Sequence, residues 1–462
     1  MITLTAAEIA AITGGTVTGT SGEVKVTGPV VIDSRRAEPG ALFAALPGEH
    51  ADGHDFAAAA AAKGAAAVLG TRPVEGVPVI VIADVLKAMA DLAHAVLERL
   101  PDATVVGITG SSGKTSTKDL TGQLLERLGP TIAPEGSFNN EIGFPLTVLR
   151  ADERTRYLVL EMGARGIGHI AYLCGIAPPK IGAVLNVGRA HAGEFGSMDG
   201  VAKAKGELAE AVSADGVAVL NADDPRVAAM AGRTRAKIVK FGDKGDFRAE
   251  DVALDDLSRA SFRLVTPDGE APVALKLHGA HHVANALAAA AIAARLGMAV
   301  DTIAEALSAA TARSGKRMEL NRRPDGVLVV NDAYNANPDS MKAAIEALAQ
   351  MTGNHARRGI AVLGHMAELG EIDEASHVEA GRLAARTGVA VLVAVGEDAR
   401  PLLDGAREFT DWQGEAIAVP DPGAAVTALR NILRPGDVVL VKASKAAGLT
   451  AAADGLLAET DR

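Results

Sequence analysis

The stretch that decides the fold is TVVGITGSSGKTS, residues 104–116, which joins a β-branched run, a turn of small residues and the start of a helical pattern. Glycines let the backbone amides of such a turn curl around an anion, and the N-terminus of the following helix adds a positive dipole. The Lys114 amine can reach terminal phosphates, and the Thr115 hydroxyl can bind Mg²⁺. We therefore predict a nucleotide-binding loop that uses Gly110, Ser111, Ser112, Gly113, Lys114, Thr115 and Ser116.

The loop departs from the strict phosphate-loop spacing, because Ile108 stands where that pattern has its first glycine. An ordinary glycine and serine turn before a helix is the alternative. The strand before the loop favours nucleotide binding, as does the helical pattern over 114–128, which places Leu120, Leu124 and Leu128 on one face.

Strand-like runs alternate with helical patterns on both sides of this loop, for example at 157–160 and 217–220. Such alternation predicts parallel strands joined by helical crossovers. Short strands also occur in the first 84 residues, and the alternation resumes near Arg313. We predict an α/β protein of three domains, with a small N-terminal domain (1–84), a central domain with the phosphate loop (85–312) and a C-terminal Rossmann-like domain (313–462).

Composition excludes several classes of protein. The 462 residues carry a formal net charge of −11, which disfavours non-specific nucleic-acid binding. Cys174 is the one cysteine and cannot form a disulfide within the chain, so a reducing compartment is expected. The N-terminus lacks the pattern of an export signal, and no apolar run approaches about 18 residues. We predict a cytoplasmic protein without membrane insertion.

Two candidate metal ligands follow predicted strands close to the loop. Glu161 comes directly after the strand at 157–160, and His191 follows the strand at 183–187. Ligands collect at the carboxyl ends of parallel strands, and Mg²⁺ prefers carboxylate and phosphate oxygens. Glu161 is thus a natural ligand, whereas His191 read alone is more typical of a hydrogen-bonded loop residue.

Lys205 occupies an unusual position for a charged side chain. It shares a helical stripe with Val201, Leu208 and Val212, whereas Lys203 points elsewhere. A lysine on an apolar stripe can extend its amine toward solvent. Alternatively, an unprotonated amine can react with CO₂ to form a carbamate that binds a second Mg²⁺. The sequence leaves both readings open.

Taken together, these residues resemble the ATP-dependent Mur ligase family over essentially the whole chain. The resemblance implies that Lys114, Glu161, His191 and Lys205 are catalytic, that ATP binds with Mg²⁺, two ions being expected, and that Lys205 is carbamylated. Thr115, Glu161, His191 and carbamylated Lys205 would hold the metal. The motif NNEIGFP, residues 139–145, implies that Asn139 and Asn140 face the substrate, although the motif alone would be read as a plain turn.

Further motifs of the family lie nearer the C-terminus. The segment GAHHVANA, residues 279–286, resembles the adenine-side helix start, from which Asn285 is carried over as an ATP-binding residue. His282 stands where the family more often has Asn. The motifs RME (317–319) and NDAYNANP (331–338) imply that Arg317, Asp332 and Asn337 bind ATP, with helix capping as the alternative for Asn337.

The N-terminal motifs point to the substrate. The motifs DSR (33–35), PGALF (39–43) and DGHDF (52–56) look like the family's uridine-nucleotide recognition segment, so Ser34 and Arg35 are expected to bind substrate. Read by itself, a lone surface arginine is usually solvated. The motifs GHMAELG (364–370) and KASK (442–445) match the dipeptide-adding branch, and the DNPR element of tripeptide-adding relatives is absent.

The resemblance therefore implies a monomeric ligase that joins D-alanyl-D-alanine to UDP-MurNAc-tripeptide through an acyl phosphate, the last cytoplasmic step of the peptidoglycan precursor. Domain closure on the substrates is expected, because the site is divided among three domains. A tripeptide-adding ligase, a folylpolyglutamate synthetase and a non-enzymatic nucleotide-dependent module remain as alternatives.

Overall fold

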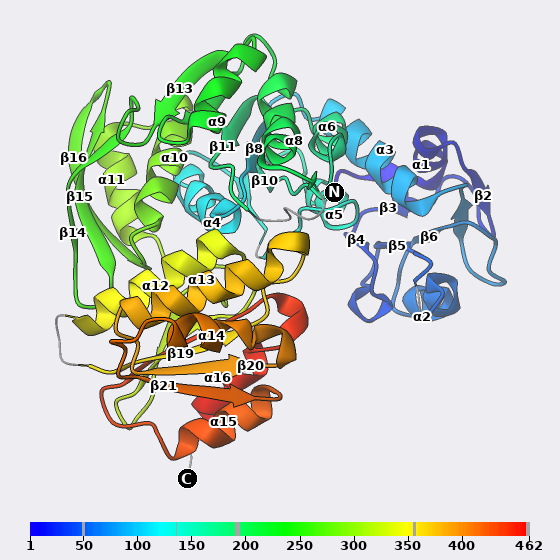
Figure 1. Ribbon diagram of the computed structural model, residues 1–462. Coiled ribbons are helices and arrows are strands. Elements are labelled where there is room, and N and C mark those ends of the chain that lie inside the picture. Colours follow the sequence, from blue (N-terminus) through cyan, green and yellow to red (C-terminus); the bar gives the residue numbers. More distant parts are fainter. Residues whose placement is uncertain (49–50, 135, 190–194, 354–356, 459–462) are drawn as a thin grey trace.

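The computed structural model describes residues 1–48, 51–134, 136–189, 195–353 and 357–458. In Figure 1 the N-terminal region (blue) and the C-terminal region (yellow to red) flank a central region (cyan to green). The three regions each contain strands and helices, as the sequence predicts. Among the described residues, no helix is both long enough and apolar enough to cross a bilayer.

The N-terminal region is built on a five-stranded sheet. Its order is β2 (Thr16–Thr18), β7 (Val79–Val81), β6 (Ala67–Gly70), β5 (Leu42–Ala44) and β4 (Val30–Val31). Only β2 pairs antiparallel with its neighbour in this sheet. A small antiparallel pair, β1 (Leu4–Thr5) and β3 (Lys25–Val26), and the helices α1 (Ala6–Thr13) and α2 (Ala57–Ala62) complete the region.

The helix α3 (Val85–Glu98) leads from the first region into the second. It begins at Asp84, whose carboxylate accepts the amides of Leu86 and Lys87. Its apolar face packs against α1 and against two helices of the central region, α5 (Gly143–Val148) and α6 (His169–Ile176). One continuous apolar cluster therefore spans both regions.

The central sheet has six parallel strands, as alternation of strands and helices predicts. Its order is β13 (Lys237–Phe241), β12 (Val217–Asn221), β11 (Ile181–Val184), β8 (Thr104–Thr109), β10 (Tyr157–Glu161) and β9 (Thr131–Ile132). Its helices include α4 (Lys114–Leu125), α8 (Met198–Ala211), α9 (Pro225–Ala229), α10 (His282–Arg295) and α11 (Val300–Ala309).

Two local predictions in this region are wrong. The strand β11 ends at Val184 rather than Val187, because the Val187 amide bonds to the Asp224 carboxylate instead of a neighbouring strand. The helix α4 ends at Leu125, so Leu128 lies beyond it and is 37% exposed. In both cases apolar residues continue beyond the last residue of the strand or helix, so the prediction is too long at its C-terminal end.

A three-stranded antiparallel sheet interrupts the parallel pattern and was not predicted. It consists of β14 (Arg248–Leu254), β15 (Arg259–Thr266) and β16 (Gly269–His278). Alternate residues of β16 are buried, and the strand packs against α11, while Glu270 and Lys276 lie on the exposed face. The alternation of apolar and polar residues over 270–277 carries the signal for this sheet.

The C-terminal region contains a mixed six-stranded sheet. Its order is β17 (Glu319–Arg322), β18 (Leu328–Asp332), β22 (Val438–Lys442), β19 (Gly359–Gly364), β20 (Val391–Val395) and β21 (Glu415–Val419). The edge strand β17 is antiparallel, unlike the other strands of this sheet. The helices α12 (Pro338–Gly353), α13 (Asp373–Arg386) and α14 (Pro401–Arg407) cover one apolar face, and α15 (Pro422–Arg430) and α16 (Thr450–Ala458) the other.

Candidate active site

The predicted phosphate loop links β8 to α4 as expected. Gly113 has a φ of +80°, which L side chains rarely adopt. A β-carbon on Gly110 would lie 2.9 Å from the Leu185 side chain. The Lys114 amine donates to the Gly110 carbonyl over 2.8 Å, and burial lowers the Lys114 pKa. The loop thus places small residues and helix-start amides where an anion can approach closely.

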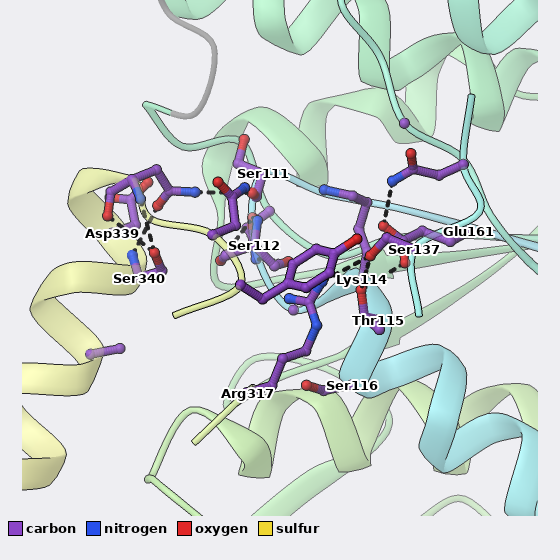
Figure 2. A pocket seen from close by; sticks show the side chains of 18 of the residues that line it. Ser111, Ser112, Lys114, Thr115, Ser116, Ser137, Glu161, Arg317, Asp339 and Ser340 are labelled. Atoms are coloured by element: carbon purple, nitrogen blue, oxygen red, sulfur yellow. Dashed lines mark hydrogen bonds between the residues drawn. The ribbon is translucent and has the colours of Figure 1, made fainter. Parts of the chain in front are cut away.

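The Thr115 hydroxyl faces the carboxyl end of the neighbouring strand β10. It donates a 2.7 Å hydrogen bond to Oε2 of Glu161, the last residue of that strand. The second carboxylate oxygen of Glu161 accepts from the Asn139 amide over 2.6 Å, and Ser137 Oγ lies 2.8 Å from the Thr115 hydroxyl (Figure 2). Thr115, Ser137 and Glu161 supply oxygen donors of the kind that Mg²⁺ prefers, so the donor set fits this metal.

The structure confirms that Lys205 lies on the buried face of its helix. Lys205 is 3% exposed, whereas Lys203 is exposed on the same helix. Lys205 lines the same cavity as Lys114 and Glu161. Burial holds its pKa well below the usual lysine value, and the nearby Lys114 charge lowers that pKa further. Both effects disfavour the charged form of the Lys205 amine.

His191 lies outside the described residues. The chain that leads toward it is held against the phosphate loop, because Ser111 Oγ accepts from the Gly188 amide over 2.8 Å. The next amide, of Arg189, donates to the Asp339 carboxylate of α12 over 2.9 Å. This segment thus contacts both the phosphate loop and the C-terminal region.

The predicted ATP-binding residues Arg317, Asp332 and Asn337 line the cavity that also contains Lys205 and Glu161. The Arg317 guanidinium donates to Ser137 Oγ over 2.8 Å and lies 4.4 Å from the centre of the Tyr334 ring. The Asp332 carboxylate accepts from the buried Lys442 amine over 2.6 Å. Figure 2 shows Arg317 beside the phosphate loop.

Asn337 caps α12, since its Oδ1 accepts the Ser340 amide over 2.9 Å. The same side chain donates to the Ser111 carbonyl over 3.3 Å. Capping of α12 and contact with the phosphate loop therefore coexist in one residue.

Asn285 lies on the inner face of α10. Its Oδ1 accepts from Thr117 over 3.3 Å, and its amide group lies 3.3 Å from Nδ1 of His282. Burial holds the His282 pKa well below its usual value, and the neighbouring His281 and His278 lower it further. His282 thus serves as a neutral neighbour of Asn285.

The predicted substrate residues fall into two places. Asn139 and Asn140 line the cavity, and Asn140 Oδ1 also accepts the Gly143 amide at the start of α5. Ser34 and Arg35 lie in the N-terminal region and are not among the residues that line the cavity. The Arg35 guanidinium pairs with Asp33 and is largely exposed.

The phosphate loop, Glu161, Lys205, Asn285 and Arg317 meet in a cavity of about 500 Å³ between the central and C-terminal regions. Sequence reasoning missed several residues of this wall, among them Ser137, Tyr334 and Lys442. Tyr334 and Lys442 lie inside the motifs quoted above, and Ser137 stands two residues before Asn139. Their position within or beside these motifs could have marked them as site residues. Ser137 and Lys442, however, meet their partners Arg317 and Asp332 only in the folded chain.

Family models match three successive parts of the chain. "Mur ligase family, catalytic domain" matches residues 29–103, "Mur ligase middle domain" matches 108–293, and "Mur ligase, glutamate ligase domain" matches 316–445. Together these matches span most of the chain.

Two curated relatives of the chain bear the same description, UDP-N-acetylmuramoyl-tripeptide–D-alanyl-D-alanine ligase. The protein of Mycobacterium tuberculosis H37Rv is 51% identical, with 99% of this chain and 98% of that protein covered. The protein of Escherichia coli K12 is 36% identical, with 91% of each chain covered.

Solved structures agree with these matches. A crystal structure of MurF from Acinetobacter baumannii is similar with a TM-score of 0.88 at 32% identity, covering 99% of both chains. MurF of Thermotoga maritima in complex with ADP is similar with a TM-score of 0.81 at 29% identity, covering 94% of this chain and 98% of that one. The present chain belongs to the Mur ligase family.

Proposed function

We propose that this protein is the ATP-dependent ligase that joins D-alanyl-D-alanine to UDP-MurNAc-tripeptide in the synthesis of the peptidoglycan precursor. One observation carries the proposal: the phosphate loop, the Thr115 and Glu161 pair, buried Lys205 and Arg317 line one cavity. The relatives of matching length bear the name of this activity. We expect the reaction to take place in the cytoplasm.

The phosphate loop is the proposed site of ATP. Its backbone amides and the Lys114 amine would hold the phosphates, with Asn285, Arg317, Asp332 and Asn337 around the rest of the nucleotide. Thr115 and Glu161, with His191, would hold Mg²⁺. Bound Mg²⁺ supplies positive charge that stabilises the phosphates as negative charge shifts during transfer.

We assign Lys205 a carbamate, which completes the catalytic set of Lys114, Glu161 and His191. The unprotonated Nζ of Lys205 forms a bond to the carbon of CO₂ and loses one proton, which leaves a carboxylate on a long side chain. Burial and the Lys114 charge favour the unprotonated amine that this step requires. The modified side chain would supply a ligand for a second Mg²⁺.

The proposed reaction makes an amide in two steps. A carboxylate oxygen of the tripeptide bonds to the terminal phosphorus of ATP, and ADP leaves. The amine of the dipeptide then bonds to the acyl carbon and loses a proton, and phosphate leaves. Lys114 and Arg317 reduce the repulsion between the two anions that meet in the first step. Closure of the regions on the substrates would limit the access of water to the acyl phosphate.

The N-terminal region is the proposed site of the uridine nucleotide. Ser34 and Arg35 would contact that end of the substrate, and Asn139 and Asn140 would face the end that reacts. The regions 1–84, 85–312 and 313–462 would thus serve the uridine nucleotide, ATP and the acceptor. We expect the protein to act as a monomer.

The test is ADP release by the purified protein with Mg-ATP and UDP-MurNAc-tripeptide, in separate assays with D-alanyl-D-alanine, single amino acids or no acceptor. The proposal requires turnover that depends on the dipeptide, with a product of the pentapeptide mass. Turnover with a single amino acid would instead identify a tripeptide-forming relative.

A further inference from the structure

Two neighbouring residues of α4, Lys118 and Asp119, form a buried charged pair one helical turn after Lys114. The Lys118 amine is fully buried and donates to Oδ1 of Asp119 over 2.6 Å. The same amine donates to the Pro134 carbonyl. A buried pair loses its favourable interaction with water, so it is tolerated where further hydrogen bonds complete it. The remaining hydrogen bonds of this pair therefore show what it holds in place.

The second oxygen of Asp119 reaches the segment that joins the central region to the C-terminal region. This Oδ2 accepts the Ser314 amide over 2.9 Å, and Ser314 is itself buried. One turn further along α4, the Gln123 side chain bonds to both the amide and the carbonyl of Thr311, over 3.1 and 2.9 Å. The segment 311–314 is therefore fastened to the helix that begins at the phosphate loop.

The same network fixes the backbone just before Ser137. Ser314 Oγ accepts the Gly136 amide over 3.0 Å, and the Lys118 amine binds the Pro134 carbonyl. Because Gly136 is the residue next to Ser137, its hydrogen bond limits where the Ser137 side chain can lie. The position of Ser137 thus depends on a hydroxyl that is 177 residues away in the chain.

Ser137 lies between two residues of the proposed nucleotide site. Its Oγ is 2.8 Å from the Thr115 hydroxyl and accepts from the Arg317 guanidinium over 2.8 Å. Because the Thr115 hydroxyl donates its proton to Glu161, Ser137 donates its own proton to Thr115. A displaced Ser137 would therefore break a chain of hydrogen bonds that runs from Arg317 to Glu161.

The backbone around Arg317 is strained. Lys316 has a φ of +62° and Met318 a φ of +52°, in the left-handed region that L residues rarely adopt. Strain of this kind persists where the surrounding structure enforces it. The Met318 amide donates to the Asp332 carboxylate over 3.1 Å, and the Ser314 amide is bound to α4. Both ends of the short segment that carries Arg317 are therefore fixed.

Stabilisation of α4 is the alternative role for this network. Asp119 and Ser314 are not among the residues that line the cavity of the nucleotide site, whereas Ser137 is. An effect of Asp119 or Ser314 on a ligand in this cavity must therefore pass through Ser137. A measurement of ligand binding consequently separates the two roles, because stabilisation of the helix requires no such effect.

We propose that Asp119 and Ser314 are positioning residues, which hold Ser137 between Thr115 and Arg317. This inference rests on the proposed function through its nucleotide site. It makes the binding of nucleotide depend on the segment that joins the central and C-terminal regions.

The first test is the binding of Mg-ADP, measured by calorimetry, which requires no acceptor dipeptide. Ser314→Ala leaves the Gly136 amide without its partner, so the Kd should rise about fivefold or more. The kcat/KM for ATP should fall about 10- to 100-fold, because Ser137 is displaced. The KM for D-alanyl-D-alanine should stay within about twofold. Ser314→Thr keeps the hydroxyl and should retain most of the binding.

Thr121→Ala is the matched control. Thr121 is buried on α4, and its Oγ1 has no hydrogen-bond partner among the residues that the structure describes. This variant loses a buried hydroxyl without breaking a hydrogen bond, so its Tm can fall while the Kd for Mg-ADP stays within about twofold. An equal rise in the Kd of Thr121→Ala and Ser314→Ala would show that any change near α4 weakens binding, and would overturn the inference.

The second test asks whether Ser314 acts through Ser137. In a Ser137→Ala background, Ser314→Ala should raise the Kd less than twofold further, because the side chain that it positions is gone. Effects that multiply in the double variant would overturn the inference. Asp119→Asn keeps one acceptor oxygen in place of two and should raise the Kd as Ser314→Ala does. A fall in Tm without a rise in the Kd would contradict the role given to Asp119.

Failure of the proposed function gives a different result. Wild-type protein that does not bind Mg-ADP would refute the nucleotide site itself. Wild-type binding that Ser314→Ala leaves unchanged would refute the positioning role alone.

Discussion

The Thr115 hydroxyl donates a 2.7 Å hydrogen bond to the Glu161 carboxylate. This contact joins the first turn of α4 to the end of β10, so the phosphate loop and the carboxylate of the neighbouring strand form one unit. Parallel strands bring their carboxyl ends to the same edge of a sheet, which is why residues 46 positions apart meet there.

Replacement of Thr115 by alanine tests this unit. Thr115→Ala removes the oxygen that faces Glu161 and Ser137, so kcat/KM should fall about 100-fold or more. Thr115→Ser keeps the hydroxyl and should retain most of the activity. Binding of Mn²⁺ with ADP, measured by calorimetry, should weaken in the alanine variant only. Equal binding in both variants would exclude Thr115 as a metal ligand.

Lys205→Ala should abolish activity, because it removes the amine that we propose to be carbamylated. Short carboxylates such as acetate should restore part of the activity. Lys203→Ala is the control on the exposed face of the same helix and should be nearly silent. Wild-type activity should fall in buffers depleted of CO₂ and bicarbonate, and full activity of Lys205→Ala would refute the carbamate.

Lys118 tests the stability of α4, the helix that follows the phosphate loop. Its fully buried amine pairs with Asp119 over 2.6 Å and also donates to the Pro134 carbonyl. Lys118→Ala leaves a buried carboxylate without this partner, so the free energy of unfolding should fall by about 3–5 kcal/mol. Urea denaturation measures this loss. Lys87→Ala removes an exposed pair with Asp91 and should leave the urea midpoint nearly unchanged.

The lowered pKa of His282 predicts that the free energy of unfolding decreases in acid. Its pKa in the folded protein is well below 6.5, so the unfolded chain binds more protons once the pH falls below about 6.5. The contribution of neutral His282 is therefore present above that pH and declines as the pH falls. His282→Asn should reduce the difference between urea midpoints at pH 7.5 and pH 5.5. An unchanged difference would show that His282 does not contribute.

Much of the central region could be predicted because its signals are local. The glycines and Lys114 of the phosphate loop lie between a strand and a helix whose patterns are strong. Helical spacing also separated buried Lys205 from exposed Lys203. The sequence did not predict the antiparallel sheet β14–β16 or the antiparallel edge strand β17. The direction in which a strand pairs depends on the neighbouring strands, so the residues of one strand carry little information about it.

The sequence by itself determined the family resemblance, the three α/β regions and the residue types that a nucleotide site requires. Only the tertiary structure decided that Arg317 meets Ser137, 180 positions away, and that Asn337 meets Ser111, 226 positions away. These contacts join side chains from separate regions. The helical and strand periodicity of the sequence describes neighbouring residues only and does not predict such contacts.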